Sequence, residues 1–182
     1  MENQIQKVEA EVLDHVGIAS DIIDQLNVVK IIDAIIPKKA SHFKVTHGQA
    51  IKAIILSGLG FHDRRLYSVD RYFKYRPIDR IFGKNLEWKD FSDDVLASTL
   101  DKIQEYGVNN FFFDIVGKII LKNKYLFNFV GNIDTTSLSM MGKFKKKVIG
   151  CRPLHGHSKD KRPDLLQMVL SMGITGPAKI PF

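Results

Sequence analysis

The sequence predicts an α+β protein, with an all-helical amino-terminal domain at residues 1–125 followed by a strand-forming region at residues 126–182. In the first part, apolar residues recur at spacings of three and four between turn signals, as they do in amphipathic helices. Residues 127–139 and 167–174 instead alternate between two kinds of side chain, which is typical of strands. A chain of 182 residues can form one domain or two small ones.

Three helices are expected before residue 60. Ser20 is a suitable N-cap for a first short helix, and residues 28–36 fit a second helix that ends before a proline. Thr46 or His47 precedes a third, stronger helix that ends at a glycine. The apolar stripe expected on this helix consists of Ala50, Ile51, Ile54, Ile55 and Leu59.

Four more helices are expected before residue 125. Residues 68–75 and 77–82 fit two short helices, the second entered through a proline in its first turn. Ser92, followed by two acids, is a good N-terminal signature for the next helix, which a glycine stops. Asn109 or Asn110 then opens the last helix. Together these signals make the first part of the chain all-helical.

The strand-forming region begins with FNFVGNIDTTSLS at residues 127–139. Alternation places its phenylalanines and Ile133 on one face, and its asparagines and Asp134 on the other. A second strand is expected at residues 167–174, and the start of a third at residues 180–182. A sheet that stops in mid-strand leaves an unpaired edge, so the sequence predicts an interrupted sheet.

Asp134 is the strongest candidate for a functional side chain. It lies near the end of the first predicted strand and is followed by four hydroxyl residues. A carboxylate beside such groups can bind a metal ion, and hydroxyls can orient it or bind a phosphate. The alternative is an ordinary strand-end or turn aspartate, because aspartate is common in turns.

A strongly basic segment occupies residues 143–162. It has eight lysines and arginines against one aspartate, which accounts for the whole formal charge of +7. Such a segment suits a polyanionic partner, whose phosphates cations bind with release of counterions. A solvated loop is the alternative. The candidate DNA-binding residues here are Lys143, Lys145, Lys146, Lys147, Lys159, Lys161 and Arg162.

The helical part contains a second mixture of cations and aromatic residues. Cations among tyrosines can hold a nucleic-acid backbone and stack on bases. An amphipathic helix with solvated arginines explains the same pattern. The cations are Arg64, Arg65, Arg71, Lys74, Arg76 and Arg80, among Tyr67, Tyr72, Phe73 and Tyr75.

Targeting signals and thiol chemistry are limited. No run approaches the roughly 18 apolar residues of a membrane span, and the N-terminus lacks the layout of a signal peptide. We therefore expect a cytoplasmic protein that does not bind membranes. Cys151 is the single cysteine and cannot form an internal disulfide.

Several segments resemble the amino-terminal part of DDE-type insertion-sequence transposases of bacteria and archaea. They are LDHVGIASDIIDQL, HGQAIKAIILSGLGF, SDDVLASTLDKIQEYGV, IDTTSLS and HGHSKDKRPDLLQMVL, within residues 13–182. The resemblance implies a helical domain of unknown function followed by the first strands of an incomplete ribonuclease-H-like core. It also implies DNA transposition by strand cleavage and transfer, in which three carboxylates hold two metal ions, Mg²⁺ by preference.

By this resemblance Asp134 is the first catalytic carboxylate and a metal ligand. Asp160 and Asp164 precede the second strand and do not match the remaining acids; Asp164 is expected to pair with a neighbouring cation or cap a turn. Among the histidines, His155 and His157 could contact DNA, with fixing of the loop as the preferred interpretation. The second and third carboxylates are missing from these 182 residues, so we expect no strand cleavage by this polypeptide alone.

Three functional readings follow. In the first, the chain is the amino-terminal part of a transposase and its partners are DNA at transposon ends, a second copy or the full-length enzyme. In the second, it is a non-catalytic DNA-binding or interaction module that acts as an accessory or repressor of transposition. In the third, reached without the resemblance, it is a helical scaffold that contacts no nucleic acid.

Overall fold

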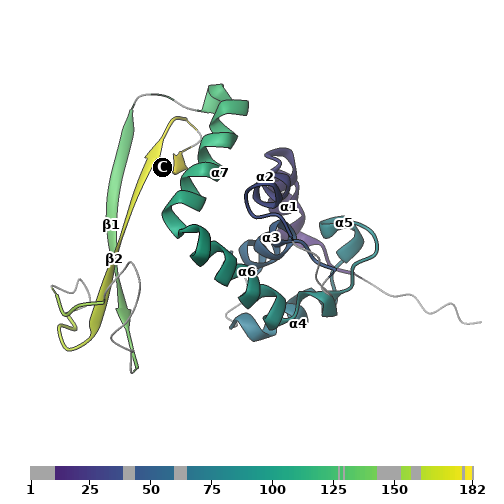
Figure 1. The fold of residues 1–182 in the computed structure, drawn as a ribbon, viewed down its shortest axis with the longest axis horizontal. Coiled ribbons are helices and arrows are strands. Elements are labelled where there is room, and N and C mark those ends of the chain that lie inside the picture. The colour runs from purple at the N-terminus through teal and green to yellow at the C-terminus, as the bar shows by residue number, and fades with distance from the viewer. Residues whose placement is uncertain are drawn as a thin grey trace, which may run out of the picture. The chain divides into compact units, whose positions relative to one another are not determined.

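The computed structural model describes residues 11–38, 44–59, 65–126, 128, 130–142, 153–156, 161–177 and 179–181. The chain divides into two compact units, Met1–Ile119 and Ile120–Phe182. The α-helices lie mainly in the first unit, and a three-stranded antiparallel sheet lies in the second (Figure 1). The mixed α+β class expected from the sequence is confirmed.

Helices occupy the amino-terminal part of the chain, as the apolar spacing predicts. None of them, within the described residues, combines the length and apolar character needed to span a bilayer. The α-helices are α1 (Asp14–Gln25), α2 (Val28–Ile35), α3 (His47–Gly58), α4 (Val69–Phe73), α5 (Ile78–Phe82), α6 (Asp93–Tyr106) and α7 (Val108–Lys122). Short 3-10 turns are η1 (Leu66–Ser68), η2 (Trp88–Phe91) and η3 (Lys124–Leu126).

Helix α1 begins earlier than the sequence predicts. It starts at Asp14, whose Oδ1 accepts a hydrogen bond from the Val16 amide at 3.1 Å. Ser20 is therefore not an N-cap, and the expectation for it is wrong. Ser20 lies inside the helix and is buried with Val16 and Ile23, since spacings of four and three put all three on the core-facing side.

Helix α3 begins as predicted but buries only part of the expected stripe. The Thr46 hydroxyl accepts from the Gln49 amide at 3.2 Å, and the Gln49 side chain accepts from the Thr46 amide at 2.9 Å, which makes a capping box. The buried apolar positions are Ala50, Ala53 and Leu56. Ile55 and Leu59 of the expected stripe are exposed.

Small residues explain this rotation of α3. An ideal Cβ on Gly48 would lie 2.4 Å from the backbone oxygen of Val29 in α2, so the two helices approach too closely for a side chain there. The Gly48 amide donates to Oδ1 of Asp33 in α2 at 2.7 Å, which satisfies a free amide of the helix start. Close packing through glycine and alanine leaves Ile51 and Ile54 half-buried beside the core and turns Ile55 outward.

An aromatic cluster forms the centre of the helical unit. The rings of Phe73, Phe82 and Phe91 come from α4, α5 and η2, with centroids 5.1, 5.8 and 4.3 Å apart for the three pairs. Their side chains are buried and lie in one apolar core with residues of α1, α3 and α6. Burial of this kind supplies most of the driving force for folding a unit of this size.

The later helix boundaries are close to those predicted. Helix α6 begins after Ser92 and ends at Gly107, whose positive φ of 98° suits glycine. Helix α7 begins at Val108, so neither Asn109 nor Asn110 is its cap and that expectation is wrong. The Phe111 amide bonds to the carbonyl of Gly107, which carries the backbone directly from one helix into the next.

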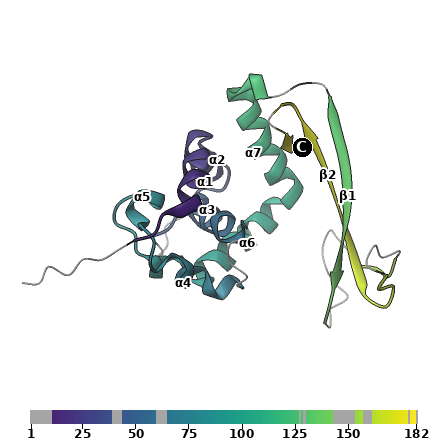
Figure 2. The ribbon, with the colours of Figure 1, turned by 180° about the vertical axis from the view of Figure 1, so that it is seen from behind.

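The sheet has the order β1 (Gly131–Met140), β2 (Leu166–Thr175) and β3 (Ile180–Pro181), and all pairs are antiparallel. Figures 1 and 2 show β1 and β2 as one long pair of arrows. Strand β1 starts four residues later than predicted. Before it, the Thr175 hydroxyl donates to the Val130 carbonyl at 2.9 Å, and the Gly176 amide donates to the Asn128 side chain at 3.1 Å.

Candidate functional site

Asp134 lies inside β1 rather than near its end. It is the fourth residue of the strand and pairs with Met172 of β2. The turn interpretation is therefore wrong. Its side chain is exposed, and Oδ1 accepts a hydrogen bond from the Thr135 amide at 2.7 Å. The contact fixes one carboxylate oxygen and leaves the group open to solvent.

The register decides which side chains share a face with Asp134. Direct partners in an antiparallel pair lie on one side, as do residues two apart along a strand. Asn132 and Thr136 therefore flank Asp134, opposite Ile174 and Leu170. Of the four hydroxyls after Asp134, only that of Thr136 is on its face. The polar face of β1 thus joins the apolar face of β2, which alternation within each strand could not show.

An open hollow of about 340 Å³ lies against this part of the sheet. Its lining is mostly apolar, with polar groups contributed by β1 alone. The lining residues are Asn132, Ile133, Asp134, Thr135, Thr136, Leu170, Met172 and Ile174.

These residues could supply some, but not all, of the ligands of a magnesium site. Mg²⁺ prefers carboxylate and carbonyl oxygens, with water and substrate phosphates completing six positions. On the Asp134 face, the carboxylate has the Asn132 amide and the Thr136 hydroxyl as polar neighbours. Over the described ranges no three His, Cys, Asp or Glu side chains come together as a metal cluster. Asp134 is thus the single charged ligand that this stretch of β1 offers.

Most of the predicted basic segment falls outside the described residues, namely Lys143, Lys145, Lys146, Lys147 and Lys159. Lys161 and Arg162 are described and exposed. Arg162 forms a two-pronged ion pair with Asp164, at 2.8 Å from Nε and 2.7 Å from a terminal nitrogen. The expected pairing of Asp164 with a cation is confirmed.

The same ion pair changes the titration of both partners. The hydrogen bonds from Arg162 lower the pKa of the Asp164 carboxyl, and the Asp164 carboxylate raises the pKa of Arg162. Both groups stay charged near neutral pH, and the guanidinium is already engaged. Lys161 is the better placed of the two described cations for a phosphate contact.

The loop before β2 is fastened by Gln167. Its backbone exchanges two hydrogen bonds with Leu154, at 2.8 and 3.1 Å, and its buried side chain donates to the carbonyls of Gly156 and Arg162 at 3.4 Å. His155 Nδ1 lies 3.3 Å from the carbonyl of Pro163. This contact agrees with the loop-fixing interpretation of His155, whereas His157 lies outside the described residues.

The cations of the helical unit have different environments. Arg76 is largely buried, donates to the Tyr72 carbonyl at 2.9 Å and pairs with Asp14 at 3.4 Å, so its role is structural. Arg64 lies outside the described residues. The remaining predicted cations are exposed: Arg65, Arg71, Lys74 and Arg80.

Two lysines and two aromatic rings form what we call the lysine–tryptophan cluster, consisting of Lys74, Tyr75, Trp88 and Lys89. The Lys74 ammonium lies 5.2 Å from the centroid of the Tyr75 ring and 5.9 Å from that of Trp88. The Lys89 ammonium lies 5.5 Å from the Trp88 centroid. Sequence reasoning missed Trp88 and Lys89, although an isolated tryptophan beside a lysine was a usable signal.

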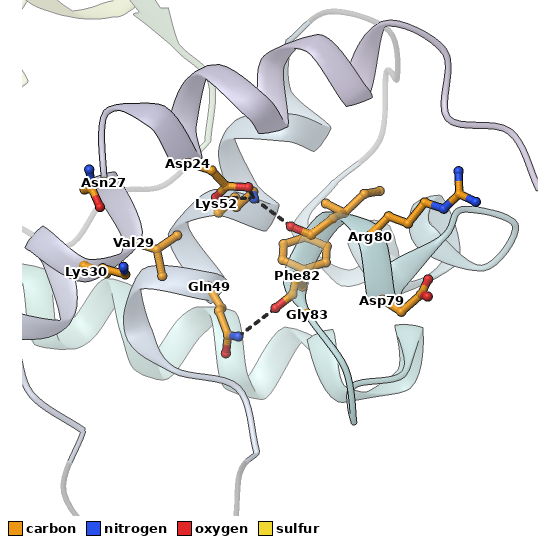
Figure 3. Close-up of a pocket in the computed structure, with 11 residues that line it drawn as sticks. Asp24, Asn27, Val29, Lys30, Gln49, Lys52, Asp79, Arg80, Phe82 and Gly83 are labelled. Carbon is orange, nitrogen blue, oxygen red and sulfur yellow. Dashed lines mark hydrogen bonds and ion pairs between the residues drawn. The ribbon is translucent and has the colours of Figure 1, made fainter.

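A separate pocket of about 390 Å³ lies between α1, α2, α3 and α5 (Figure 3). At its floor Lys52 Nζ donates to both carboxylate oxygens of Asp24, each at 2.7 Å, and to the Ile81 carbonyl at 2.6 Å. Gln49 donates to the Phe82 carbonyl at 3.1 Å. The three protons of the ammonium are all used by these contacts. The contacts at the floor of the pocket therefore join the helices, and the Lys52 ammonium is not available to a ligand.

Taken together, the described residues define a helical unit with an exposed cationic and aromatic surface, followed by a sheet that carries one open carboxylate. The family model described as a domain of unknown function, DUF4277, matches residues 8–117. This match covers more than half of the chain, so the chain belongs to the DUF4277 family. No curated protein and no solved structure matched the chain.

Proposed function

We propose that the chain is the DNA-binding amino-terminal part of a DDE-type insertion-sequence transposase. The observation that carries the proposal is the open face of β1 and β2, where Asp134 is exposed in mid-strand. The connection between these two strands is the basic segment 143–162. A carboxylate and a cationic segment on the same strand pair suit a phosphodiester substrate and its metal ions.

In this proposal Asp134 is the first catalytic carboxylate and holds part of a magnesium site. Bound Mg²⁺ would supply activation of the attacking oxygen and stabilisation of the leaving oxygen. The Thr135 amide orients the carboxylate through its 2.7 Å hydrogen bond. Lys161 and the other lysines of the basic segment neutralise DNA phosphates at transposon ends. Access to DNA also implies a cytoplasmic location.

Cleavage requires further carboxylates to converge on the metal ions. In the described residues no three His, Cys, Asp or Glu side chains come together as a metal cluster around Asp134. The 182-residue polypeptide therefore binds DNA without cutting it, and it contributes to transposition through a second copy or through full-length transposase.

We expect purified protein to leave supercoiled plasmid intact in 10 mM-range Mg²⁺, because one carboxylate cannot hold two metal ions. The measurement is conversion of supercoiled to nicked plasmid on an agarose gel, with Asp134→Ala as the matched variant. Magnesium-dependent nicking that disappears in Asp134→Ala would contradict the prediction. Equal nicking by both proteins identifies a contaminating nuclease.

A non-catalytic accessory or repressor is the second candidate. It is favoured by the lysine–tryptophan cluster, which belongs to the helical unit and needs no contribution from Asp134. The two candidates are separated by complementation: a transposase part restores strand transfer when joined to the rest of a catalytic core. A repressor instead lowers the transposition frequency of a complete enzyme supplied beside it.

A further inference from the structure

We infer that the lysine–tryptophan cluster is a contact surface for the phosphodiester backbone of duplex DNA. The inference rests on the proposed function and deepens it, because it assigns DNA contact to one surface of the helical unit. It requires cations that are free to bind a ligand and a rigid support that holds them. It also requires side chains that bind a phosphate in preference to a nucleobase.

The cations are available. Lys74 and Lys89 are both exposed, and neither ammonium forms an ion pair with an acid in the described part of the chain. Each ammonium lies over the Trp88 ring, that of Lys74 at 5.9 Å and that of Lys89 at 5.5 Å from its centroid. Two positive charges held at one ring raise the local positive potential, which attracts a phosphate.

The base of the surface is rigid. Trp88 begins η2 and packs against the apolar core that contains Phe73 and Phe91. Because the indole packs against this core, the two lysines that contact its ring have a fixed partner before any ligand arrives, which lowers the entropic cost of binding. Tyr75 adds an exposed ring and a hydroxyl donor at the same place, with 66% of the residue accessible.

The acids that flank Trp88 and Lys89 in the sequence do not cancel this charge. Asp90 pairs with Lys44 at 3.7 Å through one oxygen and accepts the Glu87 amide at 2.8 Å through the other. Asp90 is therefore neutralised locally. With the Lys44–Asp90 pair set aside, the exposed Glu87 stands against Lys74 and Lys89, which leaves an excess of one cation.

The chemistry favours phosphates over bases. An ammonium is a compact point charge that contacts phosphate oxygens without a required orientation. The Trp88 ring is only partly exposed and has both ammonium groups at its surface, so an unpaired base has little ring left on which to stack. We therefore choose duplex backbone over single-stranded nucleic acid as the partner.

The test measures binding of the whole 182-residue protein to a fluorescein-labelled 20-base-pair duplex by anisotropy at several NaCl concentrations. Lys74→Gln and Lys89→Gln should each lower the slope of log K against log[salt] by about one, and the double variant by about two. Lys118→Gln removes the same charge from exposed α7 and is the matched control, with no change expected. Circular dichroism melts confirm that all variants fold.

Trp88 adds a direct readout because it is the only tryptophan. Duplex binding at the cluster should change its emission in the wild type and in Lys118→Gln. An unchanged slope and emission in the double variant, with duplex binding intact, overturns the inference and leaves the proposed function standing. The inference is also overturned if Lys118→Gln lowers the salt slope as much as Lys74→Gln does. Tighter binding of single-stranded DNA than of the duplex overturns it as well. Absence of any wild-type binding at low salt overturns the proposed function itself.

Discussion

At the scale of single residues, Lys52 shows how a charge can stabilise the fold instead of binding a ligand. Only 2% of Lys52 is exposed, and its ammonium joins α1 to α5 through Asp24 and the Ile81 carbonyl. Asp24 is half exposed, so water screens part of the attraction. The value of the contact lies mainly in satisfying groups that would otherwise be buried without partners.

Replacing Lys52 should therefore destabilise the helical unit. We expect Lys52→Met to lower the free energy of unfolding by about 2 to 4 kcal/mol, since it leaves the Ile81 carbonyl and part of Asp24 unsatisfied. Urea denaturation followed by circular dichroism measures the change. Lys30→Met, an exposed lysine of α2 beside the same pocket, should stay within about 0.5 kcal/mol of the wild type. Equal effects of the two variants would show that the buried contacts contribute nothing.

The residue scale also shows the limit of sequence reasoning about Asp134. The alternation of residues 127–139 correctly indicates a strand, but a period of two says nothing about the partner strand. Only the register shows that Asp134 lies opposite Met172, beside apolar side chains of β2. A strand-end or turn position was the alternative for Asp134 because aspartate is common in turns, yet the pairing with β2 keeps it inside the strand.

At the scale of elements, the contact of α2 with α3 is set by the absence of a side chain at Gly48. The backbone oxygen of Val29 occupies the space of a Cβ, at 2.4 Å. Gly48→Ala should therefore push the helices apart and destabilise the protein by about 1 to 3 kcal/mol. Gly58 of the same helix has open space around its Cβ position, so Gly58→Ala should be neutral or slightly stabilising. Thermal melts of both variants test this prediction. Similar melting midpoints would contradict the close approach of α3 to α2 at Gly48.

Helix positions were largely predictable, whereas helix rotations were not. Capping by Thr46, the glycine stop after α6 and the proline before α5 all act locally, so the sequence alone indicates them. The buried side of α3 depends on which neighbour comes closest, and this is a tertiary effect. Large isoleucines suggest a core stripe, but small residues at the α2 contact decide which side faces inward.

At the scale of the whole molecule, the two units have separate sources of stability. The apolar core around Phe73, Phe82 and Phe91 lies within the first unit, and so does a smaller buried cluster of Ile32, Ile36, Ile103 and Phe111. The sheet unit depends instead on the long β1–β2 pair and the bonds of Gln167 and Thr175.

A shorter polypeptide of residues 1–126 should consequently fold by itself. We expect the helical far-ultraviolet circular dichroism spectrum and one cooperative thermal transition, because the aromatic cluster and its surroundings are retained. Calorimetry of the short and the 182-residue polypeptides provides the comparison. Loss of cooperativity in the short form would mean that the helical core requires the sheet unit.

The antiparallel order β1-β2-β3 places β1 at one border of the sheet, with ten residues paired on one side to β2. In the described residues β1 pairs with β2 alone, and amide and carbonyl groups along a border strand can in general accept another strand, although the Thr135 amide already bonds to the Asp134 carboxylate. A strand that paired with this border would extend the sheet. It would lie next to the part of β1 that contains Asp134. In concentrated solution the β1 strands of two copies can pair with each other, which favours aggregation. Dilution or mild denaturant should therefore reduce aggregation of this protein.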